Sequence, residues 1–150
     1  MIRPFRSETE RYGEYSKAGE FVYDHPFLWG SKRTGPDLAR EGGKYPNLWH
    51  YLHMDNPRSM SPGSIMPSFP WLLTDDLDTS LTAAKIRVMQ KLGVPYPKGF
   101  DLKANALLEV QADSIAADLQ RNKVPADPNK EIIALIAYLQ RLGTDIKAKP

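Results

Sequence analysis

Glu131-Ile132-Ile133-Ala134-Leu135-Ile136-Ala137-Tyr138-Leu139-Gln140-Arg141-Leu142 is the stretch that decides the fold class of this chain. Its apolar residues return every three or four positions, which is the spacing of one face of a helix. Upstream, Asp127-Pro128 fits an N-cap followed by proline at the first helical position. Downstream, Gly143 fits a helix end. We therefore predict a helix that closes the chain and buries its apolar side.

Other segments of the chain also have helical signals. Residues 101–122 keep an amphipathic spacing, and serine, threonine and aspartate stand where caps are expected. No alternating pattern of useful length predicts a strand. The expected helices are one opened by the capping box Ser7-Glu8-Thr9-Glu10 and running to about Phe21, one over 47–54, one from a cap at Thr74 or Ser80 to Leu92, and one over 101–122.

The 13 prolines and 10 glycines separate these helices by long loops. They crowd residues 24–46, which should lack regular structure, and residues 56–71, which should form a stiff extended loop. The prediction is an all-α fold with about five helices and long Pro/Gly-rich loops.

The composition is that of an ordinary globular chain. Its 150 residues are enough for one domain that buries about two-thirds of its unfolded surface. The formal net charge is only +2, and basic residues are scattered among acidic ones, so no nucleic acid partner is expected. Apolar runs are shorter than the roughly 18 residues of a membrane helix, and no signal peptide is recognisable, so we expect this chain by itself to be soluble.

The histidines are candidates for a metal site. His50 and His53 are three positions apart, a spacing that can bring two imidazoles to one zinc ion. No third ligand is evident, so packing or hydrogen bonding at the edge of a cofactor is the favoured interpretation. For His25, a loop hydrogen bond to the backbone is expected. Because nucleotide-binding and nucleophile motifs are also absent, the chain is not predicted to be an enzyme by itself.

Met66 differs from the other methionines because it lies between prolines in Pro62-Gly63-Ser64-Ile65-Met66-Pro67. Met54, Met60 and Met89 lie in or beside predicted helices, where methionine usually fills core space. A thioether is a soft, weak ligand that raises the potential of haem iron opposite histidine, and it must be held by a stiff backbone. The spacing leaves both axial ligation and loop packing open for Met66.

Several runs of sequence are specific enough to suggest a family. They are Ile2-Arg3-Pro4-Phe5-Arg6-Ser7-Glu8 continuing to Arg11-Tyr12-Gly13-Glu14-Tyr15-Ser16, then Trp29-Gly30-Ser31-Lys32-Arg33-Thr34-Gly35-Pro36-Asp37-Leu38, and Pro62-Gly63-Ser64-Ile65-Met66-Pro67. The chain resembles, over its whole length, the mono-haem cytochrome c subunit (subunit II) of cbb3-type cytochrome c oxidases. This resemblance implies a class I cytochrome c-like domain, with Met66 in the position of the sixth iron ligand.

The sequence departs from that family in one respect. The haem-attachment motif C-x-x-C-H occurs nowhere, because the chain has no cysteine. In the family this motif comes just before a segment that begins like Met1, so we expect the chain to start after it, with both cysteines and the proximal histidine outside. The resemblance then implies haem c in the full-length subunit, no covalently bound haem in this chain, and no activity of this fragment alone.

Other site residues follow from the same resemblance. Haem propionates need guanidinium or indole donors, which makes Arg33 the first candidate, with Arg6 and Trp71 next. Surface salt bridges and packing are the alternatives for all three. Residues 74–122 are long for a small cytochrome c and are interpreted as a helical insertion that docks on partner subunits. Without haem, the loops over 24–71 are expected to be displaced, mobile, or packed against another copy of the chain, which would make the fragment self-associate.

The function that the resemblance implies is electron transfer. The subunit would relay electrons through a His/Met haem c to the oxygen-reducing catalytic subunit of the respiratory chain complex. Its expected partners are the catalytic and di-haem subunits, and its expected location is the periplasmic face of the inner membrane. The alternative is a haem-free helical docking domain that holds the subunits of a membrane complex together.

Overall fold

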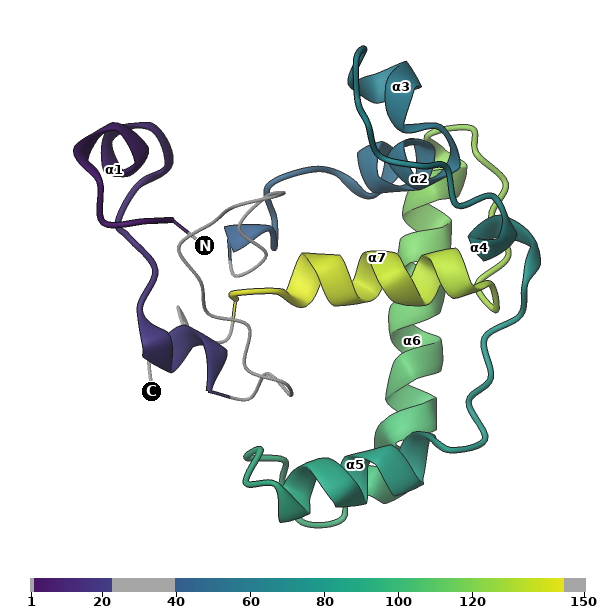
Figure 1. Cartoon of the computed structure of the whole chain (residues 1–150). Coiled ribbons are helices and arrows are strands. Elements are labelled where there is room, and N and C mark those ends of the chain that lie inside the picture. Colours follow the sequence, from purple (N-terminus) through teal and green to yellow (C-terminus); the bar gives the residue numbers. More distant parts are fainter. Residues whose placement is uncertain (1, 23–39, 145–150) are drawn as a thin grey trace. The chain divides into compact units, whose positions relative to one another are not determined.

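The computed structural model describes residues 2–22 and 40–144, which form helices joined by turns and loops (Figure 1). This part of the chain has no β-strand, only an isolated antiparallel bridge between Asp76 and Lys130. The all-α prediction is confirmed. Two compact units can be distinguished: Tyr45–Tyr138, and Met1–Lys44 together with Leu139–Pro150.

The unit Tyr45–Tyr138 is built on the crossing of α6 (Phe100–Arg121) and α7 (Glu131–Arg141), which is visible in Figure 1. Both helices bring an apolar stripe to the crossing. Burying one aliphatic side chain contributes about 1.5–3 kcal/mol, so this contact stabilises the unit strongly. The buried cluster consists of Ala112, Ile115 and Leu119 of α6 and Ile132, Ile133 and Ile136 of α7.

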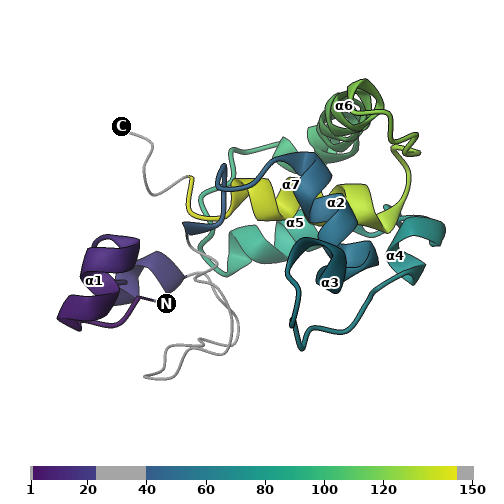
Figure 2. The ribbon, with the colours of Figure 1, turned by 90° about the horizontal axis from the view of Figure 1, so that it is seen from above.

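Two further helices follow one another, the first of them beside α6. They are α2 (Asn47–Asp55) and α3 (Pro57–Met60), and α2 lies on the same side of α6 as α7 when the chain is viewed along α6 (Figure 2). A polar contact fixes α2 there, because the Asn47 side-chain amide donates to the Asp118 carboxylate at 3.0 Å. Between the two helices the Asn56 carboxamide oxygen caps α3 by accepting from the backbone N–H of Arg58 at 3.2 Å.

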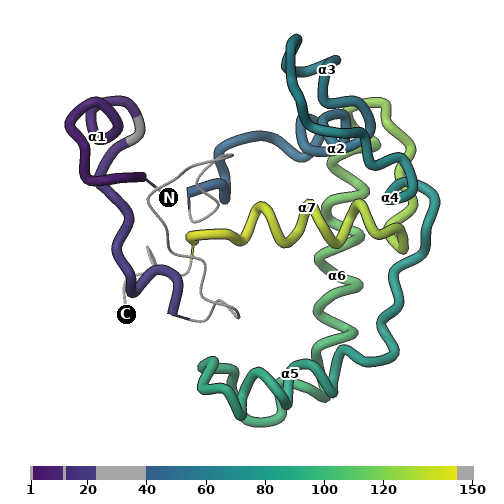
Figure 3. Tube along the Cα trace, viewed as in Figure 1, coloured from purple at the N-terminus to yellow at the C-terminus, as the bar shows by residue number. Residues whose placement is uncertain are grey.

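After α3 the chain continues through α4 (Trp71–Thr74) and a long connection to α5 (Thr82–Lys91), as Figure 3 traces. Polar contacts join the start of that connection to Lys130, the residue before α7. The Lys130 ammonium pairs with Asp76 at 2.6 Å and donates to the carbonyl oxygen of Thr74 at 2.9 Å. This ion pair raises the pKa of Lys130. α5 then packs against the N-terminal half of α6.

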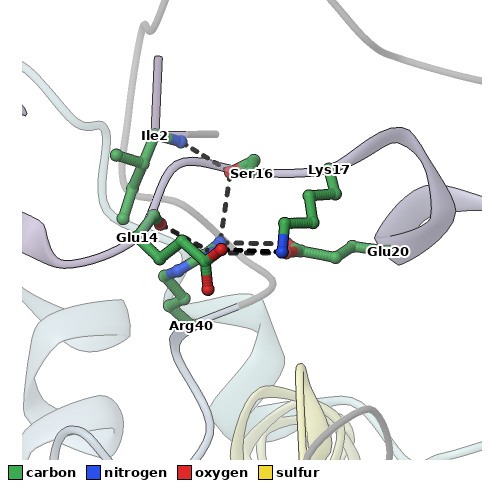
Figure 4. A network of polar contacts seen from close by, with 6 residues as sticks. All are labelled: Ile2, Glu14, Ser16, Lys17, Glu20 and Arg40. Atoms are coloured by element: carbon green, nitrogen blue, oxygen red, sulfur yellow. Dashed lines mark hydrogen bonds and ion pairs between the residues drawn. The ribbon is translucent and has the colours of Figure 1, made fainter. Parts of the chain in front are cut away.

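The other unit contains α1 (Arg6–Tyr12) and the 3-10 helix η1 (Ala18–Phe21). Figure 4 shows Arg40 at the centre of its polar contacts. The Arg40 guanidinium donates to the Ser16 hydroxyl at 3.1 Å and to the Glu20 carboxylate at 3.0 Å. Ser16 in turn accepts from the backbone N–H of Ile2 at 2.7 Å. These bonds hold the N-terminal segment against residue 40.

The predicted N-terminal helix is shorter than expected, and its predicted cap is wrong. α1 begins at Arg6 without a side-chain cap, and Glu10 is paired with Arg6 at 2.7 Å instead of reaching back to Ser7. The helix ends at Tyr12 and is followed by Gly13, whose φ of 93° is left-handed. The chain therefore cannot continue as one helix to Phe21.

Other predicted caps also differ from the structure. Neither Thr74 nor Ser80 caps α5, which starts at Thr82 after the uncapped position Leu81. Asp127 accepts from the backbone N–H of Asn129 at 2.9 Å, so it forms a local turn before α7 instead of an N-cap. Such short polar side chains stabilise turns as readily as helix ends, and sequence alone does not separate the two uses.

The prolines of the 56–71 segment also act differently from the expectation. They do not keep it wholly extended, because α3 and α4 each add one helical turn, at Pro57 and Trp71. Proline is compatible with the first turn of a helix, which explains α3. These single turns account for the two α-helices beyond those predicted among the described residues.

Candidate functional site

The loop that carries Met66 is shaped by local hydrogen bonds. The backbone N–H of Ser64 donates to the carbonyl oxygen of Ser61 at 3.0 Å, which closes a turn around Gly63. Gly63 has a φ of 85°, a left-handed conformation that favours glycine. The Ser64 hydroxyl then accepts from the backbone N–H of Met66 at 3.2 Å. The loop therefore gives Met66 a defined backbone position without help from regular structure.

The far end of this loop is attached to α2. The backbone N–H of Phe69 donates to the carbonyl oxygen of Met54, in the last turn of α2, at 2.9 Å. The Met66 side chain is half-buried, whereas its neighbour Ile65 is 94% exposed. Of these two neighbouring side chains, that of Met66 therefore lies on the side of the loop that is shielded from solvent, which a metal ligand inside a protein requires.

A stack of rings extends from Tyr45 along α2. The Tyr45 and Trp49 rings are parallel, with centroids 4.0 Å apart, and the Trp49 and His53 rings follow at 4.3 Å. All three side chains are half-buried. Trp49 and His53 are four positions apart on α2 and so lie one above the other, and Tyr45, which precedes α2, extends the column. The inner ring faces of this column cover one another, so its sides present ring edges.

His50 lies beside this stack and is only 1% exposed. Its ring is close to perpendicular to those of Tyr45 and Trp49, and its centroid lies 6.1 Å and 5.4 Å from theirs. Its Nε2 atom is buried and has no hydrogen-bond partner within the described part of the chain. Burial lowers the pKa of His50, and the nearby His53 lowers it further. This imidazole is therefore neutral at physiological pH.

Of the candidate propionate donors, only Trp71 lies in the same described unit as Met66. Trp71 begins α4 and is 50% exposed, with its ring edge-on to Phe69 at 5.3 Å. Arg6 is exposed in α1, within the other unit, and pairs with Glu10. Arg33 and His25 lie outside the described residues. The structure thus leaves the propionate hypothesis untested for all three donors.

The zinc interpretation of His50 and His53 receives no support from the structure. Over residues 2–22 and 40–144 there is no group of three or more His, Cys, Asp or Glu side chains that could hold a metal ion. His53 is instead stacked on Trp49. The ring stack itself was missed in the sequence, although the spacing of Tyr45, Trp49 and His53, four residues each, is a signal that could have revealed it.

Comparison with protein-family models matches residues 1–146 to the family described as cytochrome c oxidase, mono-heme subunit/FixO. The chain belongs to the FixO family. The match covers nearly the whole chain and confirms the family that the sequence motifs suggested. None of the curated proteins matches the chain at the level required for a relative.

Family membership makes this chain a subunit of cytochrome c oxidase, an oxidoreductase complex of electron transport, and it implies a haem. The residues of the FixO chain fit a haem only in part. A half-buried thioether in a fixed loop suits a haem, whereas a thioether link requires cysteine and the chain has none. In the described part, no helix combines the length and apolar character needed to cross a bilayer.

Proposed function

We propose that this chain forms the ligand side of a haem c site, and that the subunit relays electrons through that haem to the catalytic subunit of the oxidase. The observation that carries the proposal is the Met66 loop. Its turn, its serine-to-backbone hydrogen bond and its attachment to α2 give one half-buried thioether a fixed place in a FixO chain. Met66 is the proposed axial ligand.

When bound, haem c supplies one-electron chemistry at its iron. Met66 would hold the iron on one side through its sulfur atom. The ring stack of Tyr45, Trp49 and His53, on the segment to which the loop is attached, would help to exclude water from the site. His50 remains neutral and therefore adds no positive charge beside this stack. Exclusion of water and a weak soft ligand both raise the reduction potential.

The wider role follows from the same proposal. The subunit contributes no catalytic group of its own and passes electrons within the complex, with the catalytic and di-haem subunits as its partners. We place the domain on the periplasmic face of the inner membrane. Residues 74–122 would be a helical insertion in a class I cytochrome c-like domain. Support for the insertion comes from α5 and α6, which pack together as a hairpin.

A redox titration of the haem-loaded subunit tests the ligand. Met66→Leu removes the sulfur but keeps the size and apolar character of the side chain, so the reduction potential should fall and electron transfer to the oxidase should slow. Met60→Leu is the matched control, because Met60 is also half-buried, in α3 only six positions away. An unchanged potential in Met66→Leu, or an equal fall in Met60→Leu, would contradict the assignment.

A second experiment separates haem c from a haem-free docking domain. The complete subunit is extracted with acidified acetone, and its absorbance is recorded before and after. A covalently attached haem keeps its Soret band on the protein, and we expect this result. A subunit with no Soret band before extraction would support the docking alternative and would remove the basis for the Met66 proposal.

A further inference from the structure

The end of the helical hairpin formed by α5 and α6 has a strongly biased charge. Within residues 85–103 there is one acidic side chain, Asp101. It forms an ion pair with Arg87 at 3.0 Å, so the two charges offset each other. The remaining lysines of this segment are all exposed: Lys85, Lys91, Lys98 and Lys103. In the described part of the chain, the last three have no carboxylate partner.

Exposed apolar side chains stand among these lysines. Leu102, near the start of α6, is 85% exposed. Val88 of α5 and Leu92, the residue after the end of α5, are four positions apart and about half exposed, at 53% and 51%. Tyr96, in the connecting turn, is also exposed and stacks on Phe100 with ring centroids 5.1 Å apart. The hairpin end therefore combines apolar side chains with cationic ones.

Two hydrogen bonds fix the turn between α5 and α6 in the unbound chain. The Gln90 side-chain amide donates to the carbonyl oxygen of Pro97 at 3.0 Å. The backbone N–H of Val94 donates to the carbonyl oxygen of Met89 at the same distance. A fixed turn loses little conformational entropy on binding, which favours its use as a contact surface.

We propose that this hairpin end, residues 85–103, binds the surface of an anionic phospholipid bilayer. The lysines would lie among the phosphate headgroups, where each contributes about 1 kcal/mol. Leu102, Val88 and Leu92 would enter the boundary with the acyl chains, and Tyr96 would lie at the headgroup level, which aromatic side chains with a polar end prefer. The proposal is independent of the haem ligand.

The placement of the apolar side chains favours lipid over a protein partner. Asp101 faces α5, since its carboxylate pairs with Arg87. Leu102 lies about 100° around α6 from Asp101 and so projects in a different direction. Figure 1 shows α5 at the end of α6 opposite α2, with the connecting turn beyond it. A fluid interface can receive apolar side chains that project in different directions, whereas a protein partner would need a surface shaped to fit each of them.

Vesicle flotation of the whole chain tests the proposal. The probe is a vesicle of phosphatidylcholine with about 30% phosphatidylglycerol, compared with pure phosphatidylcholine, at low and high salt. We expect the chain to float with the anionic vesicles only, and to be released by salt. Each of Lys91→Gln, Lys98→Gln and Lys103→Gln should weaken the binding by about five-fold. Leu102→Ser should weaken it as well, because less apolar area is buried.

Two control variants keep the test specific. Lys123→Gln removes an exposed lysine just after the other end of α6, and Val110→Ser removes an exposed apolar side chain from the middle of α6. Both should bind like the unchanged chain.

The proposal is overturned if the chain does not bind anionic vesicles, if it binds neutral vesicles equally well, or if the control variants lose as much affinity. Circular dichroism confirms that each variant is folded. If vesicle binding is absent but the lysine variants reduce assembly with the oxidase, the surface contacts a protein instead.

Discussion

The backbone N–H of Phe69 lies 2.9 Å from the carbonyl oxygen of Met54 and donates to it. This hydrogen bond joins the loop that carries Met66 to the last turn of α2, the helix that carries the ring stack. It brings two features that are separate in the sequence into one local structure. The loop that carries Met66 and the helix that carries the ring stack are therefore held together at this point.

The first prediction concerns the turn at Gly63. Alanine at this position would meet no atom within 4 Å, but the φ of 85° is unfavourable for a residue with a Cβ. Gly63→Ala should therefore cost about 1–2 kcal/mol locally and speed hydrogen exchange of the Met66 amide. Gly19→Ala, at an equally open position without a left-handed φ, is the control and should leave that amide unchanged. Equal exchange rates in both variants would show that the turn does not hold Met66.

The second prediction concerns the crossing of α6 and α7. Ile136 is fully buried there, at 0% exposure, and Ile136→Ala should lower the free energy of unfolding by about 2–5 kcal/mol. Tyr138→Ala, on the same helix but 57% exposed, should cost much less. Urea denaturation of both variants measures the difference. A small loss for Ile136→Ala would mean that the helices do not pack as described.

The third prediction is a pH dependence of stability. Burial and the neighbouring His53 hold the pKa of His50 below its ordinary value of 6.5 in the folded chain. The unfolded chain therefore takes up a proton at higher pH than the folded chain does. Stability from this group is complete above about pH 6.5 and falls as the pH drops below the unfolded pKa.

The free energy of unfolding, measured between pH 7.5 and pH 5 (about the range in which an ordinary histidine titrates), checks this effect. His50→Leu removes the titrating group and should make the pH dependence shallower over this range. The same slope in the variant as in the unchanged chain would assign the dependence to other groups.

A fourth prediction compares segments of the haem-free chain. Residues 56–71 are held mainly by a few local hydrogen bonds, whereas α7 places Ile132, Ile133 and Ile136 in the core. Amides of 56–71 should therefore exchange faster than those of α7. Equal protection of the two segments in a monomeric sample would refute this expectation.

A further prediction concerns the mass of the chain. The denatured chain should have the mass of the bare polypeptide in mass spectrometry, because it has no thiol to form a thioether. A mass higher by one haem would contradict this expectation.

The helices that could be predicted from the sequence are those whose periodicity is long and regular. Ile132, Ile133 and Ile136 share one face in the sequence and one core in the structure, since burial of that face is what forms α7. Residues 101–122 were predicted almost to their ends, which are Phe100 and Arg121. Caps were less predictable, because Ser7, Ser80 and Asp127 can each satisfy the backbone in more than one way.

The candidate site was predictable only in its loop. Prolines and Gly63 marked a constrained turn around Met66, and the structure shows how hydrogen bonds fix it. The hydrogen bond between Phe69 and Met54 joins backbone atoms, so the side-chain types of these residues do not predict it. The ring stack could be predicted from the four-residue spacing of its members. The attachment of α2 to the loop, which brings the stack near that loop, could not.

The near-infrared spectrum of the oxidised, haem-loaded subunit tests the central claim most directly, because sulfur coordination of haem iron gives a band in that region. We predict that the band is present in the unchanged subunit and in Met60→Leu, and that Met66→Leu abolishes it while the haem stays attached. A band of unchanged position and strength in Met66→Leu would show that another residue holds the iron, and would contradict the account.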